Sequence, residues 1–120
     1  MNDLVTTEWQ RFVNRCVWSW QGVAEVWRTE ASFRYWTLIN IFSATLVVAF
    51  PFSGAERGLI IALGILILAA EMLNSAIERA VDYTGKDIHP LAKAAKDAGS
   101  AGVALTACAG GLAWICILVS

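Results

Sequence analysis

In the first quarter of the chain, apolar and polar residues alternate with the period of an α-helix. Between residues 4 and 29, apolar side chains such as Phe12, Val13 and Trp20 recur at intervals of three or four, and charged residues fall between them. Aromatic residues therefore gather on one side of the predicted helix and arginines on the other. This pattern predicts an amphipathic helix over 4–29 that lies in a membrane interface.

Three long apolar stretches follow and have a different pattern, because each contains a long run of residues without a charge. They predict membrane-spanning helices over 33–52, 58–81 and 98–119. The last stretch carries no charge, and its 22 residues suffice at about 1.5 Å per residue to cross a hydrocarbon core of about 30 Å. Turn-forming residues separate the stretches, namely Pro51, Gly54, Gly85 and Pro90.

Composition supports the same class. The chain has 120 residues, 58% of them hydrophobic and 16% charged, with a mean hydropathy of +0.57. Soluble domains are typically about 45–50% apolar and about 25% charged. We therefore expect an all-α membrane protein with one domain over 1–120. The net charge of −1 gives no basic surface for nucleic acid, and the three cysteines have no metal-binding or disulfide spacing.

The distribution of basic residues predicts the orientation. Four of the nine Lys and Arg residues lie before the first span or at its start, four lie at the end of the second span or between it and the third, and only Arg57 falls on the other side. By the positive-inside rule, the N-terminus and the second loop are cytoplasmic. Small residues in the last span, such as Gly102 and Gly111, permit close helix packing. Three short helices make a thin bundle, so we expect a homo-oligomer.

The cytoplasmic end of the second span carries an acidic face. Glu71, Asn74, Ser75, Glu78 and Asp82 recur at three or four residues and so share one side of a helix. Glu71 lies about 20 Å along the span, below the headgroups, and Glu78 about 10 Å further on, near the water. An ionisable residue within a span costs at least about 2.5–3.5 kcal/mol, which indicates a function.

Each of these residues has a chemical interpretation and a structural one. Partial desolvation suits Glu71 to act as a general base, and Glu78 at the water edge could hold Mg²⁺. Asn74 and Ser75 could instead form hydrogen bonds between helices. Lys96, at a depth similar to that of Glu78, could meet a phosphate, or it could only snorkel to the interface. No Walker A, GxGxxG, HRD or DFG motif is present.

Three segments resemble a known family. The segments "EMLNSAIE" (71–78), "AKDAGSAGV" (95–103) and "WSWQGVAEVWRTEASFR" (18–34) are similar to the signature of the small prokaryotic diacylglycerol kinases. The similarity extends over roughly residues 9–118. The undecaprenol kinases belong to the same group and share the acidic core. Trp36, Trp18 and Asn14 depart from the diacylglycerol kinase pattern, so the choice of lipid stays open between the two.

The resemblance implies a homotrimeric lipid kinase of the bacterial inner membrane, with three transmembrane helices and one surface helix per subunit. Such enzymes transfer the γ-phosphate of MgATP to the hydroxyl of diacylglycerol and give phosphatidic acid. The implied general base is Glu71, and the implied metal ligands are Glu30 and Glu78. The implied nucleotide-binding residues are Arg11, Trp18, Glu30, Glu78, Asp87, Ile88, His89, Lys96 and Asp97. The implied lipid-substrate residues are Arg11, Glu71, Asn74 and Ser100.

Two other functions would also explain carboxylates in the membrane span of a small protein. An ion-conducting oligomer with Glu71 as a relay would need a polar stripe that continues outward, whereas residues 59–70 are unbroken apolar. A structural membrane-assembly subunit would bind no nucleotide. His89, the only histidine, stands before a proline and is typical of a surface loop.

Overall fold

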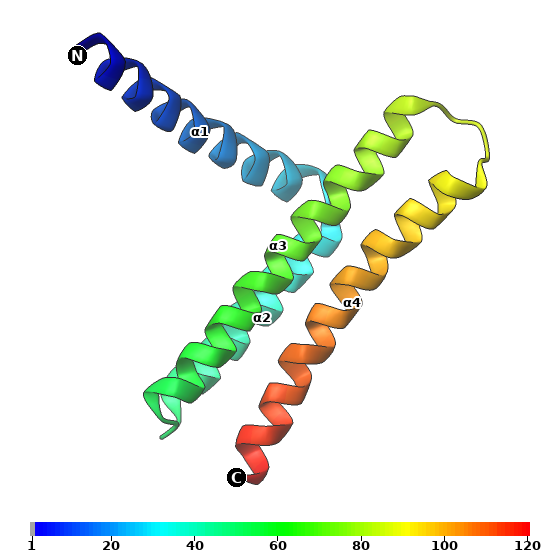
Figure 1. Cartoon of the computed structure of the whole chain (residues 1–120). Helices are drawn as coiled ribbons and strands as arrows, with labels where there is room; N and C mark the ends of the chain where they lie inside the picture. Colours follow the sequence, from blue (N-terminus) through cyan, green and yellow to red (C-terminus); the bar gives the residue numbers. More distant parts are fainter. Residues whose placement is uncertain (1) are drawn as a thin grey trace.

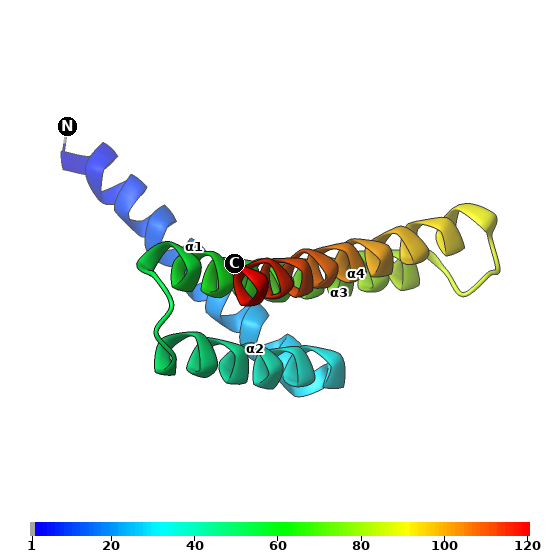
Figure 2. The same cartoon turned by 90° about the horizontal axis from the view of Figure 1, so that it is seen from below.

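The computed structural model describes residues 2–120, and the described chain is helical without strands. Its helices are α1 (Asn2–Thr29), α2 (Ala31–Ala49), α3 (Gly54–Thr84) and α4 (Pro90–Val119). Figure 1 shows α3 and α4 side by side, with α1 leaving the bundle at a steep angle. Seen from below, α3 and α4 form one layer and α2 lies in a second layer beneath them (Figure 2). The predicted all-α class is confirmed.

The turn between α2 and α3 is fixed by local chemistry. Helix α2 ends at Ala49, three residues before the predicted limit of 52, because Pro51 disfavours helical backbone at Phe50, which is extended (φ −97°, ψ 161°). A capping box then starts α3. The Ser53 hydroxyl accepts from the Glu56 backbone N–H at 3.2 Å, and the Glu56 carboxylate accepts from the Ser53 N–H at 2.7 Å.

Helices α3 and α4 extend beyond the segments predicted to lie in the membrane. Helix α3 continues three residues past 81 and stops at Gly85, whose φ of +150° suits only glycine. Helix α4 starts at Pro90, eight residues before 98. Proline fits the first turn, and His89 Nδ1 caps the helix by accepting from the Leu91 N–H at 3.1 Å. The loop that joins them therefore stands away from the apolar part of the bundle.

A sharp elbow separates α1 from α2. Glu30 has extended backbone (φ −112°, ψ 109°) and interrupts the helix. The Arg34 guanidinium donates to the Trp27 carbonyl at 2.7 Å, so a positive charge neutralises the C-terminal end of α1. Across the elbow the rings of Trp27 and Phe33 meet edge to face, with centroids 6.4 Å apart. These contacts set the direction in which α1 leaves the bundle.

A small core holds α2, α3 and α4 together at the end opposite the loop. Val47 of α2 is fully buried against Ile60 of α3 and Ala113 of α4. The Trp114 indole donates to the Ser43 hydroxyl at 2.7 Å and so ties α4 to α2. Few other side chains are buried in the described part of the chain. Most large apolar residues of all four helices face outward.

This outward-facing apolar surface differs from that of a soluble bundle, whose helices turn one apolar side inward. Two helices, α3 and α4, are long and apolar enough to cross a membrane. Helix α2 has 19 residues, which span about 28 Å at 1.5 Å per residue. Helix α1 exposes aromatic residues along its length, including Trp9, Phe12, Trp18 and Trp20. A membrane protein of at least two spans accounts for these surfaces.

Candidate functional site

Glu71 lies on the side of α3 that faces the start of α2. Only 5% of the residue is exposed, and its Oε2 accepts a hydrogen bond from the Ser32 hydroxyl at 3.2 Å. Ser75, one turn further along α3, is also buried. No cation pairs with Glu71 among the ion pairs of the described residues. A buried carboxylate with a single neutral donor has spare capacity to accept hydrogen bonds.

Asn74 links Glu78 to helix α4. Its Nδ2 donates to Glu78 Oε1 at 3.0 Å, one helical turn away. Its Oδ1 is buried and has no hydrogen-bond partner. That oxygen lies against Gly99 of α4, where a Cβ atom would stand only 2.5 Å from it. The predicted polar face is therefore an interface between two helices as well as a row of carboxylates.

Glu30 pairs with a residue that the sequence did not single out. Arg79 of α3 lies 3.6 Å from a Glu30 carboxylate oxygen and donates to the Thr29 hydroxyl at 2.6 Å. Both side chains of the ion pair are partly exposed. Arg79 directly follows Glu78, so the pair brings the elbow to the end of the acidic face that is nearer the α3–α4 loop. Glu30 therefore lies beside α3 at the residue that follows Glu78.

A shallow pocket of about 300 Å³ lies where α3 gives way to α4. The predicted nucleotide residues in its lining are Asp87, Ile88, His89, Lys96 and Asp97. Within it, Lys96 Nζ lies 2.5 Å from Asp82 Oδ1, and Lys93 Nζ lies 2.5 Å from Asp97 Oδ2. Lys86 also lines the pocket. The pocket combines ammonium groups, carboxylates and a loop, which suits a polar ligand that reaches it from water.

The charge state of Lys96 follows from its partner. Lys96 precedes the predicted membrane segment 98–119. Its pKa is raised, chiefly by the hydrogen bond to Asp82, while desolvation acts in the opposite direction. Lys96 is consequently cationic at neutral pH and available as a point charge for an anionic group.

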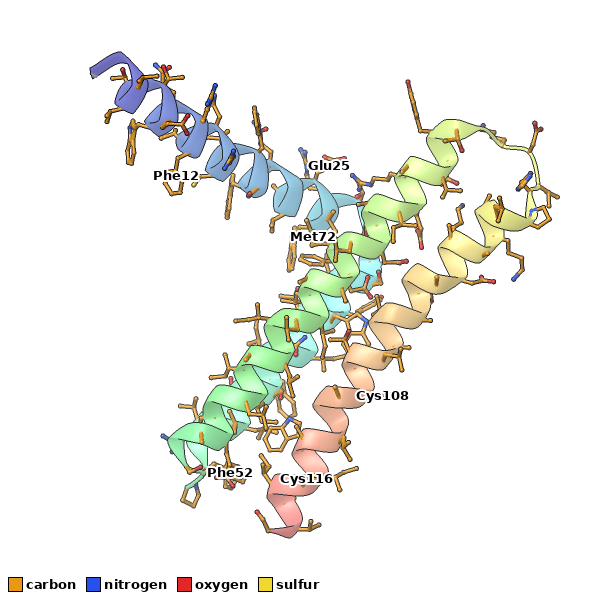
Figure 3. All side chains as sticks on the ribbon, viewed as in Figure 1. Phe12, Glu25, Phe52, Met72, Cys108 and Cys116 are labelled. Carbon is orange, nitrogen blue, oxygen red and sulfur yellow. The ribbon has the colours of Figure 1, made fainter. Side chains whose placement is uncertain are left out.

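Helix α1 keeps two predicted site residues away from this pocket. In the described chain α1 packs against α2 and α3 but not against α4. Its contact with α3 occurs near Met72, where a methyl group on Gly22 would lie 3.8 Å from the Met72 Cε (Figure 3). Arg11 pairs with Glu8 at 2.5 Å, and Trp18 is 64% exposed. One subunit therefore does not bring Arg11 or Trp18 to the α3–α4 loop.

The carboxylates offer an incomplete metal site. Among residues 2–120 no group of three or more His, Cys, Asp or Glu side chains is arranged to hold a metal. Mg²⁺ differs from zinc in this respect, because it uses one or two carboxylates and completes its shell with water and phosphate oxygens. Glu30 and Glu78 fit that requirement by their chemistry. Ser100, predicted near the substrate, is exposed on α4.

Several contacts at the site were not predicted from the sequence. They are Ser32 at Glu71, Arg79 at Glu30, Asp82 at Lys96 and Gly99 at Asn74. Three of them join two helices and the fourth joins α3 to the elbow, and positions as far apart as 32 and 71 share no periodic signal. The sequence offered only partial clues, since it placed Asp82 on the acidic face, allowed Asn74 to bond between helices and put Lys96 at the depth of Glu78.

Comparisons with known proteins place the whole chain in context. A sequence model of the family described as prokaryotic diacylglycerol kinase matches residues 17–118. A diacylglycerol kinase of Pseudomonas aeruginosa is 42% identical over 99 residues, which cover 81% of this chain and 80% of that protein. One of Escherichia coli K12 is 33% identical over 114 residues (95% and 93%). One of Helicobacter pylori 26695 is 37% identical over 92 residues (77% and 72%).

Proposed function

The chain belongs to the prokaryotic diacylglycerol kinase family, and from this premise we propose that it phosphorylates diacylglycerol with ATP at the cytoplasmic membrane surface. The product is phosphatidic acid. The observation that carries the proposal is the buried, cation-free carboxylate of Glu71 on a helix otherwise apolar enough for a membrane. Diacylglycerol keeps its hydroxyl at headgroup level, so the base is reached sideways from the bilayer.

In this proposal Glu71 accepts the proton of the lipid hydroxyl as the oxygen attacks the γ-phosphorus of ATP. The bond between that phosphorus and the β–γ bridging oxygen breaks, and ADP leaves with the bridging oxygen. Ser32 supports the step by donating to Glu71 Oε2 and holding the carboxylate toward α2. Asn74 and Ser100 lie near the reacting hydroxyl. Such transfers depend mainly on positioning and on charge placed around the phosphate.

Glu30 and Glu78 would hold Mg²⁺, which when bound neutralises the phosphate oxygens of ATP. Lys96 and Asp97 lie at the ATP phosphates, and the loop residues Asp87, Ile88 and His89 border the nucleotide. Their shared pocket at the α3–α4 loop supports this assignment. Before a nucleotide arrives, Lys96 is held by Asp82 and Glu30 by Arg79. ATP and its cation therefore bind in exchange for internal ion pairs.

We further propose a homotrimer in the bacterial inner membrane, with α2, α3 and α4 crossing the bilayer and α1 on the cytoplasmic surface. The asymmetry of eight basic residues against one supports a cytoplasmic N-terminus and second loop. The separation of α1 from α4 supports a site shared between subunits. In such a site Arg11 and Trp18 of one copy complete the nucleotide pocket of its neighbour.

The test is a comparison of two lipids. Purified protein in mixed micelles is supplied with MgATP and either diacylglycerol or undecaprenol, and the phosphorylated lipid is measured. We expect phosphatidic acid to form at the higher rate. Faster transfer to undecaprenol would assign the alternative, an undecaprenol kinase with the same catalytic carboxylate. Transfer to neither lipid would contradict the proposed function.

Lys96 gives a prediction about nucleotide binding. Lys96→Met removes a charge-assisted hydrogen bond to phosphate, worth about 1.5–3 kcal/mol, so kcat/KM for ATP is expected to fall about 10- to 100-fold. Lys93→Met, one turn earlier on the same helix, removes a second ammonium of the pocket that pairs with Asp97, and is expected to cause a smaller loss. Initial rates measured against ATP concentration check this. Equal losses in the two variants would show that the pocket needs only net positive charge.

A further inference from the structure

Gly99 of α4 lies against Asn74, the side chain that donates a hydrogen bond to Glu78. The Asn74 amide lies between them, with its Nδ2 on Glu78 Oε1 at 3.0 Å and its Oδ1 buried without a partner. A Cβ atom on Gly99 would stand 2.5 Å from Oδ1 and 3.5 Å from the Asn74 Cγ. Real Cβ atoms do not approach an oxygen so closely, so any side chain at 99 must displace the amide.

Only one orientation of the Asn74 amide allows it to donate a hydrogen bond to Glu78. An ionised carboxylate only accepts hydrogen bonds, so the amide must turn its nitrogen to Glu78 and its oxygen to α4. At α4 the oxygen meets a helix backbone with no side chain in the way. Close approach of a polar atom to a helix surface is what glycine permits at helix interfaces. The hydrogen bond to Glu78 therefore depends on the absence of a Cβ at position 99.

We propose that Gly99 is a positioning residue for the metal-binding carboxylate: its bare Cα leaves the space in which Asn74 orients Glu78. This inference rests on the proposed role of Glu78. Lys96 lies three residues before Gly99 and so shares its face of α4, where it bonds Asp82 of α3. The same helix contact therefore sets both the rotamer of Glu78 and the location of the phosphate-facing ammonium.

The displaced atom is the end of a flexible side chain, and this has a specific consequence. Asn74 can rotate away from a new Cβ without moving either helix, so Gly99→Ala costs little stability. Rotation of the Asn74 side chain breaks its hydrogen bond to Glu78. The substitution is therefore expected to weaken metal binding rather than to lower stability. A glycine required only for helix packing would behave in the opposite way, with a lower Tm and unchanged metal dependence in the folded fraction.

The experiment is a double-mutant cycle on the full chain, with Gly99→Ala, Asn74→Ala and the double variant. The measured quantities are the Mg²⁺ concentration for half-maximal phosphatidic acid formation, Mn²⁺ binding followed by electron paramagnetic resonance without lipid or nucleotide, and Tm. Gly102→Ala is the matched control, because a Cβ there meets nothing within 4 Å. We expect Gly99→Ala to raise the half-saturating Mg²⁺ and to weaken Mn²⁺ binding, each by about tenfold, with Tm close to wild type.

In the Asn74→Ala background the amide is gone, so Gly99→Ala should cause no further loss. Additive losses, or wild-type Mn²⁺ binding in Gly99→Ala, would overturn the proposal. If Gly99→Ala does not fold, Mn²⁺ binding by Asn74→Ala tests the proposal instead. Unchanged Mn²⁺ binding in that variant would exclude a positioning role for the amide. A wild-type protein that binds Mn²⁺ but transfers no phosphate to diacylglycerol would instead contradict the proposed function.

Discussion

Glu71→Gln is expected to reduce phosphate transfer to the lipid by about 10²- to 10⁴-fold, the usual contribution of a general base. Glutamine has the same shape, and its amide oxygen still accepts from the Ser32 hydroxyl, which lies 3.2 Å from the carboxylate. The variant therefore removes the proton acceptor, while the side chain at position 71 keeps its position and its contact with Ser32. It also removes a buried charge, so Tm is expected to equal or exceed that of the wild type. Turnover at saturating ATP and lipid measures the loss.

Two further variants distinguish the effect of losing the base from the effects of losing another carboxylate or a neighbouring hydrogen bond. Glu25→Gln, which removes an exposed carboxylate of α1, should retain wild-type turnover. Ser32→Ala removes the donor and leaves the base, so its loss should be smaller than that of Glu71→Gln, about 10-fold or less for a single hydrogen bond. Wild-type turnover by Glu71→Gln would rule out Glu71 as the base. The hydroxyl would then lose its proton to water or phosphate.

The helices could be predicted from the sequence because their cause is local. The period of three to four residues before Thr29 and the three apolar runs each depend on neighbours in the chain, and the all-α class follows. The ends were less predictable. Residues 90–97 form helix although they carry lysines and an aspartate, because Pro90 and the His89 cap start α4 early. Apolar patterns report the membrane-facing part of a helix, not its full length.

The site could be predicted only as far as it lies on one helix. The spacing of Glu71, Asn74 and Glu78 was sufficient to align them on a single face of α3, and the structure has them there in one helix. Which face of α4 meets them depends on how the helices pack. The approach of Asn74 to Gly99 is such a contact, and no spacing in the sequence encodes it.

The same limit explains why Asp82 was hard to interpret. From sequence it is the last carboxylate of an acidic row, near water. In the structure it is the partner of Lys96, fourteen residues away, across the α3–α4 connection. An exposed pair of this kind contributes about 0–1 kcal/mol to stability. In the proposed function, the pair keeps the Lys96 ammonium at the pocket until a phosphate of ATP competes for it.

Glu78→Gln is expected to lower activity by on the order of a hundredfold or more at ordinary Mg²⁺ concentrations, because a metal contributes several kcal/mol of charge stabilisation at a phosphoryl group. The glutamine oxygen can still accept from Asn74 Nδ2, which lies 3.0 Å from Glu78 Oε1. The change therefore isolates the loss of charge from the loss of position. Activity is measured across a range of Mg²⁺ concentrations.

Glu78→Asp keeps the charge and shortens its reach, so high Mg²⁺ should restore more of its activity than that of Glu78→Gln. Glu30→Gln should raise the Mg²⁺ requirement in the same direction, since Glu30 is the second proposed metal ligand and pairs with Arg79, the residue after Glu78. A Glu78→Gln enzyme with the Mg²⁺ dependence of the wild type would show that the cation is held by ATP alone. Glu78 would then act on the nucleotide by another route, and Glu30 would lose its proposed partner.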